Sequence, residues 1–145
     1  ETVLPIADPS FERELVARQV RERLVGQDVG TSLSPDVVDV LVSVFRDLRT
    51  GTTSEGAVVT RPKSVMSTAE AVNVGHAALL DAHYLDGATP GGGHVARQVE
   101  GVVFKDDAED QRKYRAYVDT VVKARARSSR VWADYFKAAK ARSNG

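Results

Sequence analysis

The chain has no cysteine among its 145 residues, which excludes disulfides, thiolate metal sites and a cysteine nucleophile. Apolar residues make up 42% of the sequence, yet none of its apolar runs approaches the roughly 20 residues that a membrane-spanning helix needs. The N-terminal residues have neither the basic start nor the apolar core of a signal peptide. These absences indicate a globular chain, expected in the cytoplasm and long enough to bury a core.

The motifs of several enzyme classes are also missing. There is no Gly-x-x-x-x-Gly-Lys-Ser/Thr to hold phosphates, no Gly-x-Ser-x-Gly and no His-Glu-x-x-His. The run from Gly91 to Gly93 lacks the preceding strand and the following lysine of a phosphate loop. We interpret it as a loose linker or as an adjustment at a helix start. We therefore predict no catalytic residue and expect no catalysis from this chain alone.

No metal site is predicted. His76 and His83 stand seven residues apart on one predicted helix, whereas metal-binding pairs favour closer spacing with a carboxylate or a third histidine nearby. We interpret the two histidines as part of a semi-polar seam of the core. The acidic run from Asp106 to Asp110 does not have the register of a calcium loop. It is typical of a helix start, where negative charge is favourable.

Capping residues and apolar periodicity predict about six helices. Two of them begin with an N-cap residue followed by proline, at Asp8-Pro9 and at Ser34-Pro35. They are expected to end at Gly26 and Gly51, respectively. The predicted class is all-α, a helical bundle with one small β-hairpin or extended excursion near residues 50–63, where turn-forming residues precede a β-branched segment. The side chains expected to face the core are Phe11, Leu15, Val20, Leu24, Val37, Leu41, Val44, Phe45, Leu48, Val72, Leu79, Leu80, Val95, Val99, Tyr114, Tyr117, Val118, Val121, Val122, Trp132, Tyr135, Phe136 and Ala139.

The formal net charge is zero but unevenly distributed. Residues 111–145 carry ten Lys and Arg against two Asp, a net charge of +8, so residues 1–110 carry −8. Such a basic segment is either a solvated face of helices docked on an acidic body or a surface for nucleic acid or an acidic partner. No nucleic-acid motif accompanies the charge, so the docked face is favoured and nucleic acid is not expected as a partner.

The segment from Thr60 to Leu80 is the most informative part of the chain. A short basic lead-in, held extended by Pro62, ends at Ser67, where an amphipathic helix begins. Ser67 and Glu70 have the spacing of a capping box, in which each side chain satisfies a backbone N–H group of the other residue. The N-terminus of a helix attracts phosphate through its free N–H groups and its partial positive charge.

Four segments, by their order and spacing, resemble the C-terminal region of MoxR-family AAA+ ATPases. They are Val3 to Pro9, the helix that begins at Ser34, Arg61 to Ala71, and Asp86 to Pro90 with the helix up to Val103. The resemblance implies two parts: residues 1–104 form an AAA+ lid-like helical domain, and residues 105–145 form a basic C-terminal helical extension packed on it.

This resemblance implies a function. The lid would close over nucleotide bound by an upstream core and would couple ATP hydrolysis to chaperone-like remodelling of partner proteins. ATP and Mg²⁺ would be held by that core, and the partners would be the core, neighbouring subunits of a ring and an unidentified substrate protein. The nucleotide-proximal residues of the sensor-2 region would be Arg61, Lys63, Ser67 and Thr68. Because the sequence lacks an initiator Met, we expect it to begin inside a longer gene product.

The sequence departs from the family at one position. MoxR-family proteins often place an arginine one or two residues after this serine, where the present chain has Ala69 and Glu70. Three interpretations follow: Arg61 or Lys63 substitutes from the preceding loop, the lid senses nucleotide weakly, or both cations belong to a solvated loop.

A second functional class is a stand-alone helical module without catalysis. It would bind a protein through Trp132, Tyr135 and Phe136, or bind nucleic acid through the basic C-terminal end. Steep loss of affinity with salt would separate nucleic-acid binding from protein binding.

Overall fold

The computed structural model describes residues 8–25, 32–63, 66–103 and 107–144. Within these residues the chain forms six continuous helices, which confirms the predicted all-α bundle. Three are α-helices throughout: α1 (Pro9–Arg23), α2 (Pro35–Thr50) and α7 (Arg130–Asn144). In the other three, α3 (Thr68–Asp81) continues as the π-helix η1 (Ala82–Asp86), α4 (Gly92–Gln98) as η2 (Val99–Val103), and α5 (Ala108–Tyr117) as η3 (Val118–Val122) and then α6 (Lys123–Ala126).

The two predicted starts with an N-cap residue before proline are confirmed. The Asp8 carboxylate accepts a hydrogen bond from the Ser10 backbone N–H at 3.0 Å, and the Ser34 hydroxyl accepts one from the Val37 N–H at 3.3 Å. Helix α2 ends as predicted at Gly51, whose φ of 79° is the left-handed conformation that favours glycine.

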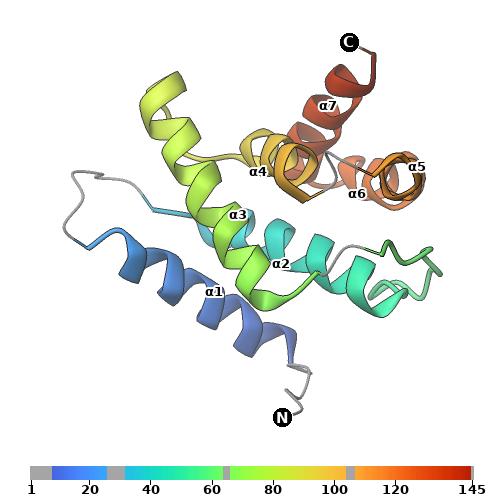
Figure 1. Ribbon diagram of the computed structural model, residues 1–145, viewed down its shortest axis with the longest axis horizontal. Helices are drawn as coiled ribbons and strands as arrows, with labels where there is room; N and C mark the ends of the chain where they lie inside the picture. Colours follow the sequence, from blue (N-terminus) through green and yellow to red (C-terminus); the bar gives the residue numbers. More distant parts are fainter. Residues whose placement is uncertain (1–7, 26–31, 64–65, 104–106, 145) are drawn as a thin grey trace.

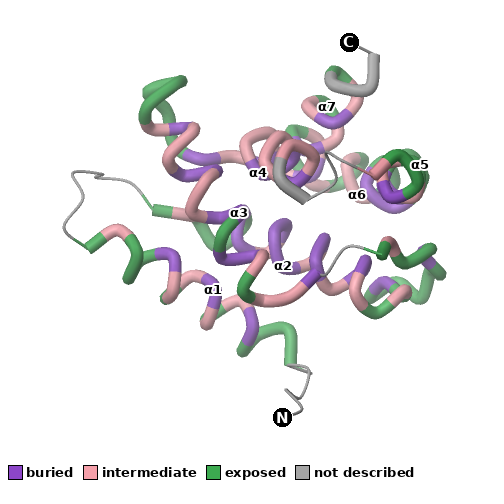
Figure 2. The backbone as a smooth tube through the Cα atoms, in the orientation of Figure 1, coloured by how far each residue is buried: buried purple, intermediate pink, exposed green. Residues whose placement is uncertain are grey.

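Helix α2 is the centre of the molecule. It packs against α1, α3, α4 and α7, and Figure 1 shows α1 at the bottom of the view with α4 to α7 above. The predicted stripe Val37, Leu41, Val44, Phe45 and Leu48 is buried throughout. Figure 2 shows burial along much of α2, whereas α1 alternates between buried and exposed positions. The core therefore surrounds α2.

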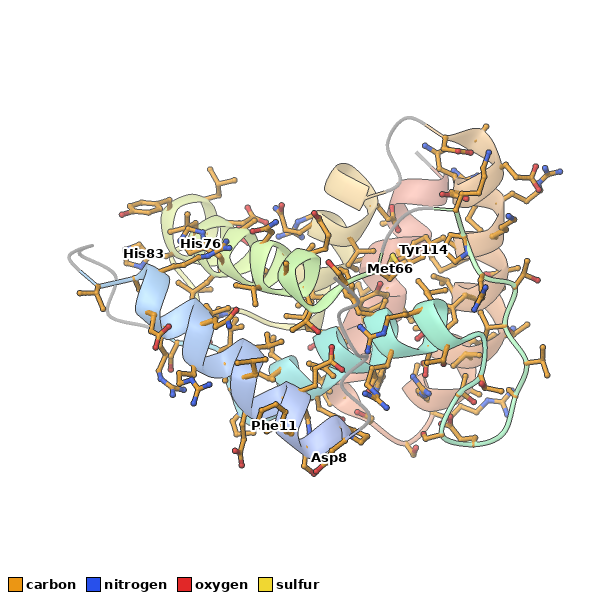
Figure 3. The ribbon with its side chains drawn as sticks, turned by 60° about the horizontal axis from the view of Figure 1, so that its bottom comes forward. Asp8, Phe11, Met66, His76, His83 and Tyr114 are labelled. Carbon is orange, nitrogen blue, oxygen red and sulfur yellow. The ribbon has the colours of Figure 1, made fainter. Side chains whose placement is uncertain are left out.

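The inward face of α1 differs from the prediction. Phe11 is 52% exposed and lies on the outside of the helix near its start (Figure 3), so its predicted place in the core is wrong. The buried positions are Glu12, Val16 and Val20, which are four residues apart and form one stripe along a helix. The predicted stop at Gly26 lies outside the described residues.

The glycine run begins α4 and does not form a loose linker. Gly91 is the N-cap and α4 starts at Gly92. A Cβ built on Gly92 would lie only 2.1 Å from the carbonyl oxygen of Val131 on α7. The linker interpretation is therefore wrong, and the alternative, an adjustment at a helix start, is confirmed. The physical reason for glycine at position 92 is that the backbones of α4 and α7 touch there and leave no room for a side chain.

The C-terminal helices bury the side chains that the periodicity selects. The buried members are Tyr114, Tyr117, Val118, Val121, Val122, Trp132, Tyr135 and Ala139, and Phe136 is partly buried against them. Helix α7 packs on α4, α6 and α2. The predicted division of the chain at residue 104 stays a prediction, and residues 104–106 lie outside the described part.

The excursion predicted near residues 50–63 is an extended loop and not a full hairpin. It contains one isolated antiparallel bridge, between Thr52 and Val58, and no named strand in the described residues. Figure 1 shows this loop in green beyond the C-terminal end of α2.

The two histidines of α3 and η1 are half-buried on the predicted seam. The Nε2 atom of His76 is buried and has no hydrogen-bond partner among the residues that the structure describes. Burial, with a smaller effect from Arg23, lowers the pKa of His76 below its ordinary 6.5, so this side chain is neutral at neutral pH. Figure 3 shows His76 and His83 along the same helix.

Candidate functional site

In the described residues, the start of α3 shows one of the two hydrogen bonds of the predicted capping box. The Ser67 hydroxyl accepts a hydrogen bond from the Glu70 backbone N–H at 3.1 Å, which confirms Ser67 as the N-cap. Met66, the residue before the cap, is 3% exposed and lies beside the start of the helix (Figure 3). The cap thus fixes the direction in which α3 leaves the basic lead-in.

A buried carboxylate meets this helix start. Glu12 of α1 is fully buried, and its Oε2 atom accepts a hydrogen bond from the Thr68 hydroxyl at 2.9 Å. Two guanidinium groups from the last turns of α2 reach the same carboxylate: Arg46 Nη1 lies 3.0 Å from Oε1, and Arg49 lies 2.9 Å from Oε1 through Nη2 and 3.2 Å from Oε2 through Nη1. Glu12, Arg46, Arg49 and Thr68 form what we call the Glu12 cluster.

The Glu12 cluster ties three helices together. Arg49 Nη1 also donates to the carbonyl oxygen of Met66 at 3.0 Å, so this single side chain joins α1, α2 and the residue that precedes the α3 cap. Residues 46 and 49 are three apart, so both guanidinium groups leave α2 on the same face. Their side chains are 20% and 24% exposed. The cluster is therefore a partly exposed joint under the start of α3.

Electrostatics keep Glu12 charged despite its burial. Burial would raise the pKa of Glu12, but the hydrogen bonds from Arg49, Arg46 and Thr68 together hold it below the ordinary 4.5. At neutral pH a negative charge thus lies at the positive end of α3, where it is favourable. The chain itself supplies the anion that this helix start attracts.

The four predicted nucleotide-proximal residues fall into two groups. Ser67 and Thr68 use their hydroxyls inside the protein, on the Glu70 N–H and on Glu12. Arg61 and Lys63 lie on the extended lead-in with exposed side chains. The structure therefore brings hydroxyls and cations to one segment but leaves only the cations facing outward.

The two cations have different surroundings. The backbone N–H of Lys63 donates to Asp110 Oδ1 at 2.8 Å, and its Nζ lies 3.5 Å from Asp107 Oδ2. These contacts attach the lead-in to the start of α5. The aliphatic part of Arg61 lies against Gly51, and within the described residues no carboxylate pairs with its guanidinium. Residues 64 and 65 lie outside the described part.

Sequence reasoning missed Glu12, Arg46 and Arg49. One signal was present: Glu12 stands four residues before Val16 and eight before Val20, on the stripe that faces the core. A charged residue in that position needs buried partners. Their identity depends on side chains 34 and 37 residues away along the chain, which periodicity does not predict.

A second ion cluster connects the basic C-terminal helices to α2. Arg125 Nη1 lies 2.9 Å from Asp47 Oδ2, which also accepts from the Tyr117 hydroxyl at 2.8 Å. Burial raises the pKa of Asp47 above its ordinary 3.8, and Arg125 and Tyr117 oppose this rise. Arg125 also lies over the ring of Trp132, 4.7 Å from its centroid, a cation–π contact. At Arg125, the basic segment is therefore docked on the acidic part of the chain, as the favoured interpretation of the charge predicts.

Two of the three aromatic residues proposed as a protein-binding surface are buried, and the third, Phe136, is partly buried. Trp132 is 6% exposed and Tyr135 is fully buried. The hydroxyl of Tyr135 lies 2.5 Å from that of Tyr114. Trp132 and Tyr135 therefore belong to the core between α5, α6 and α7, and their predicted role in partner binding is wrong.

Comparison with known proteins places the chain in a family. Residues 10–142 match the family described as "YehL-like AAA+ ATPase C-terminal domain". The chain is 33% identical over 138 residues to the uncharacterized protein YehL of Escherichia coli (strain K12), an alignment that covers 95% of this chain and 37% of that relative. No solved structure matches the chain.

The chain spans little more than a third of the length of the relative it matches. Within the described residues, none of the helices is long and apolar enough to cross a membrane. The family match covers most of the chain, including α1, the Glu12 cluster and the C-terminal helices. The chain belongs to the family of YehL-like AAA+ ATPase C-terminal domains.

Proposed function

We propose that this chain is the lid of a MoxR-like AAA+ ATPase and closes over nucleotide bound by an upstream core. The core would supply ATP and Mg²⁺ binding, since the chain has no phosphate-binding loop of its own. Around a ring of subunits, movement of the lid would couple ATP hydrolysis to chaperone-like remodelling of a partner protein. Membership of an AAA+ C-terminal domain family supports this role.

The observation that carries the proposal is the joint formed by Arg49. Because Arg49 bonds both to Glu12 of α1 and to the carbonyl oxygen of Met66, helices α1, α2 and α3 are held at one point. A lid fastened in this way would move as a unit. A displacement of the lead-in would then move α1, α2 and α3 together.

Within this proposal, phosphate recognition falls to Arg61 and Lys63. The start of α3 already has Glu12 as its anion, and the Thr68 hydroxyl is bound to that carboxylate. Arg61 and Lys63 precede this helix start and are exposed. Of the three interpretations of the sequence, substitution from the preceding loop therefore fits the geometry best.

The test is ATP turnover by the full-length parent protein carrying Arg61→Ala, Lys63→Ala or both changes. A cation that contacts phosphate in a site shielded from water contributes about 2–3 kcal/mol to transition-state binding, so each change should lower kcat/KM by roughly thirtyfold or more. Lys137→Ala, an exposed cation on α7, is the matched control and should leave turnover unchanged. Wild-type turnover in the double variant would remove both residues from the site.

A further inference from the structure

The loop between α2 and the lead-in has one open main-chain edge. The bridge between Thr52 and Val58 is flanked by two hydrogen bonds, from Thr53 N–H to the Ala57 carbonyl and from Val59 N–H to the Gly51 carbonyl, at 3.0 and 2.9 Å. In an antiparallel pair of this kind, the two bridged residues point their own N–H and C=O groups away from each other. Each side of the bridge therefore presents one outward donor and one outward acceptor.

The two sides of the bridge differ in whether their outward main-chain groups have hydrogen-bond partners. On one side, the Thr50 hydroxyl covers Thr52: it accepts from the Thr52 N–H at 3.3 Å. Its single proton is shared between the Arg46 carbonyl at 2.8 Å and the Thr52 carbonyl at 3.0 Å. On the other side, neither the N–H nor the C=O of Val58 has a partner within the described part of the chain. The Val58 side chain is 85% exposed. The Val58 side is thus an unpaired strand edge.

The loop is held firmly in this shape. Arg125, which is also bound to Asp47, donates two hydrogen bonds to the Glu55 carboxylate. They run from Nε to Oε2 at 2.9 Å and from Nη2 to Oε1 at 2.8 Å. Val59 anchors the same loop by pointing inward, where it is 8% exposed. An edge fixed before binding loses little conformational entropy when a partner pairs with it.

Charge along the edge favours one class of partner. Between Gly56 and Lys63 the only charged side chains are Arg61 and Lys63. Glu55, the nearest acid before them, is neutralised by Arg125, whose hydrogen bonds lower the pKa of Glu55 to about 2. Lys63 is already paired with Asp107, so an extended peptide that pairs with Val58 and continues past Thr60 would lie beside the positive charge of Arg61.

We propose that the Val58–Thr60 edge binds an extended, acidic segment of a partner protein by adding it as a β-strand. Main-chain hydrogen bonds to Val58 would supply affinity, as in other cases of strand addition, and Arg61 would favour acidic side chains on the partner. Unpaired edges are commonly kept short or capped, and this loop caps only the Thr52 side. The proposal goes beyond the lid role and does not depend on nucleotide.

The experiment is a titration of the full 145-residue chain, labelled with ¹⁵N, with the blocked pentapeptide acetyl-Asp-Val-Thr-Val-Asp-amide at millimolar concentration. We expect the amide signals of Val58 and Thr60 to shift and saturate. The same peptide with proline at its centre lacks the central N–H group and should give no saturable shift. Absence of a saturable shift at Val58 and Thr60, or an equal response to the proline peptide, would overturn the proposal.

Three variants sharpen the test. Val58→Pro removes the outward N–H without breaking an internal bond and should weaken binding about fivefold or more, the effect of one lost hydrogen bond. Val58→Thr keeps the N–H and the β-branched shape and should bind like the wild type. Arg61→Glu leaves the main chain intact and should reverse the preference toward a lysine-flanked peptide, which keeps the test decisive if Val58→Pro does not fold. Shifts of the same amides with protein concentration alone would assign the edge to self-association and contradict the peptide proposal.

Discussion

At the scale of single residues, Glu12 decides how the candidate site is built. It lies where the periodicity of α1 demands an apolar residue, yet it is fully buried and charged. A buried carboxylate is tolerated only when strong hydrogen bonds replace its water, and here Arg46, Arg49 and Thr68 provide them. Three helices therefore depend on one charge.

We predict that Glu12→Gln lowers the free energy of unfolding by about 3 kcal/mol, because removal of one partner from a buried ion pair leaves the other poorly compensated. Chemical denaturation of the purified chain measures this. Glu14→Gln, two residues away and exposed on the same helix, is the matched control and should change stability by less than about 0.5 kcal/mol. Equal losses in the two variants would show that the cluster contributes nothing specific.

The pH dependence of this difference has a definite sign. The folded-state pKa of Glu12 lies below its ordinary 4.5, so the stabilisation is fully present above pH 4.5 and is lost as the pH falls through the lower folded value. The difference in free energy of unfolding between wild type and Glu12→Gln should therefore be constant near neutral pH and become smaller in acid. A difference that grows in acid would contradict a lowered folded-state pKa for Glu12.

Single residues also mark where prediction from sequence stops. The caps at Asp8, Ser34 and Ser67 follow from local chemistry and are confirmed. Phe11 was assigned to the core face of α1, which is occupied by Glu12 instead, since hydropathy alone does not predict that two distant arginines can replace the water around a carboxylate. Arg61 and Lys63 were selected by their position in the chain and not by their contacts, and their role near nucleotide stays a prediction.

At the scale of elements, the backbones of α4 and α7 lie against each other at Gly92. Gly92→Ala would place a Cβ 2.1 Å from the Val131 carbonyl oxygen and 3.0 Å from the Tyr135 backbone nitrogen. Neither backbone atom can move without moving α7. We predict a loss of about 3 kcal/mol, the upper end of the usual cost of overpacking, and a fall in melting temperature of about 9 °C.

The neighbouring glycine supplies the control. A Cβ on Gly93 would lie 3.5 Å from the Ala138 Cβ, an ordinary van der Waals contact. Gly93→Ala should therefore be neutral or stabilise the chain by up to about 1 kcal/mol, because alanine is the better helix former. Thermal unfolding followed by circular dichroism compares the two variants directly. A melting temperature of Gly92→Ala equal to that of Gly93→Ala would show that α4 and α7 lie further apart.

Element boundaries followed from sequence where a cap or a left-handed glycine defines them, as at Ser34 and Gly51. At Gly91 to Gly93 the sequence left two interpretations open, because a glycine run has the same local preferences in a linker and at a close helix contact. Only the presence of Val131 on another helix separates the two cases. The π-helical turns in η1, η2 and η3 also had no counterpart in the predicted pattern.

At the scale of the whole molecule, the uneven charge of the sequence becomes a docking interaction. The segment from residue 111 onward carries a net charge of +8, and Arg125 from that segment reaches both Asp47 and Glu55 of the acidic part. Together with the contact between α4 and α7, this interaction joins the two predicted parts of the chain. The parts are then expected to lose structure together.

We predict that the chain unfolds in a single cooperative transition in urea. Its one tryptophan, Trp132, lies on α7 under Arg125, so its fluorescence reports the C-terminal part, whereas far-ultraviolet circular dichroism reports all the helices. The two transitions should coincide, as two-state unfolding requires, and Gly92→Ala should shift both to lower urea by the same amount. A fluorescence transition at distinctly lower urea would instead mean that residues 105–145 detach before the other helices unfold, in which case the lid-like part is stable without its basic extension.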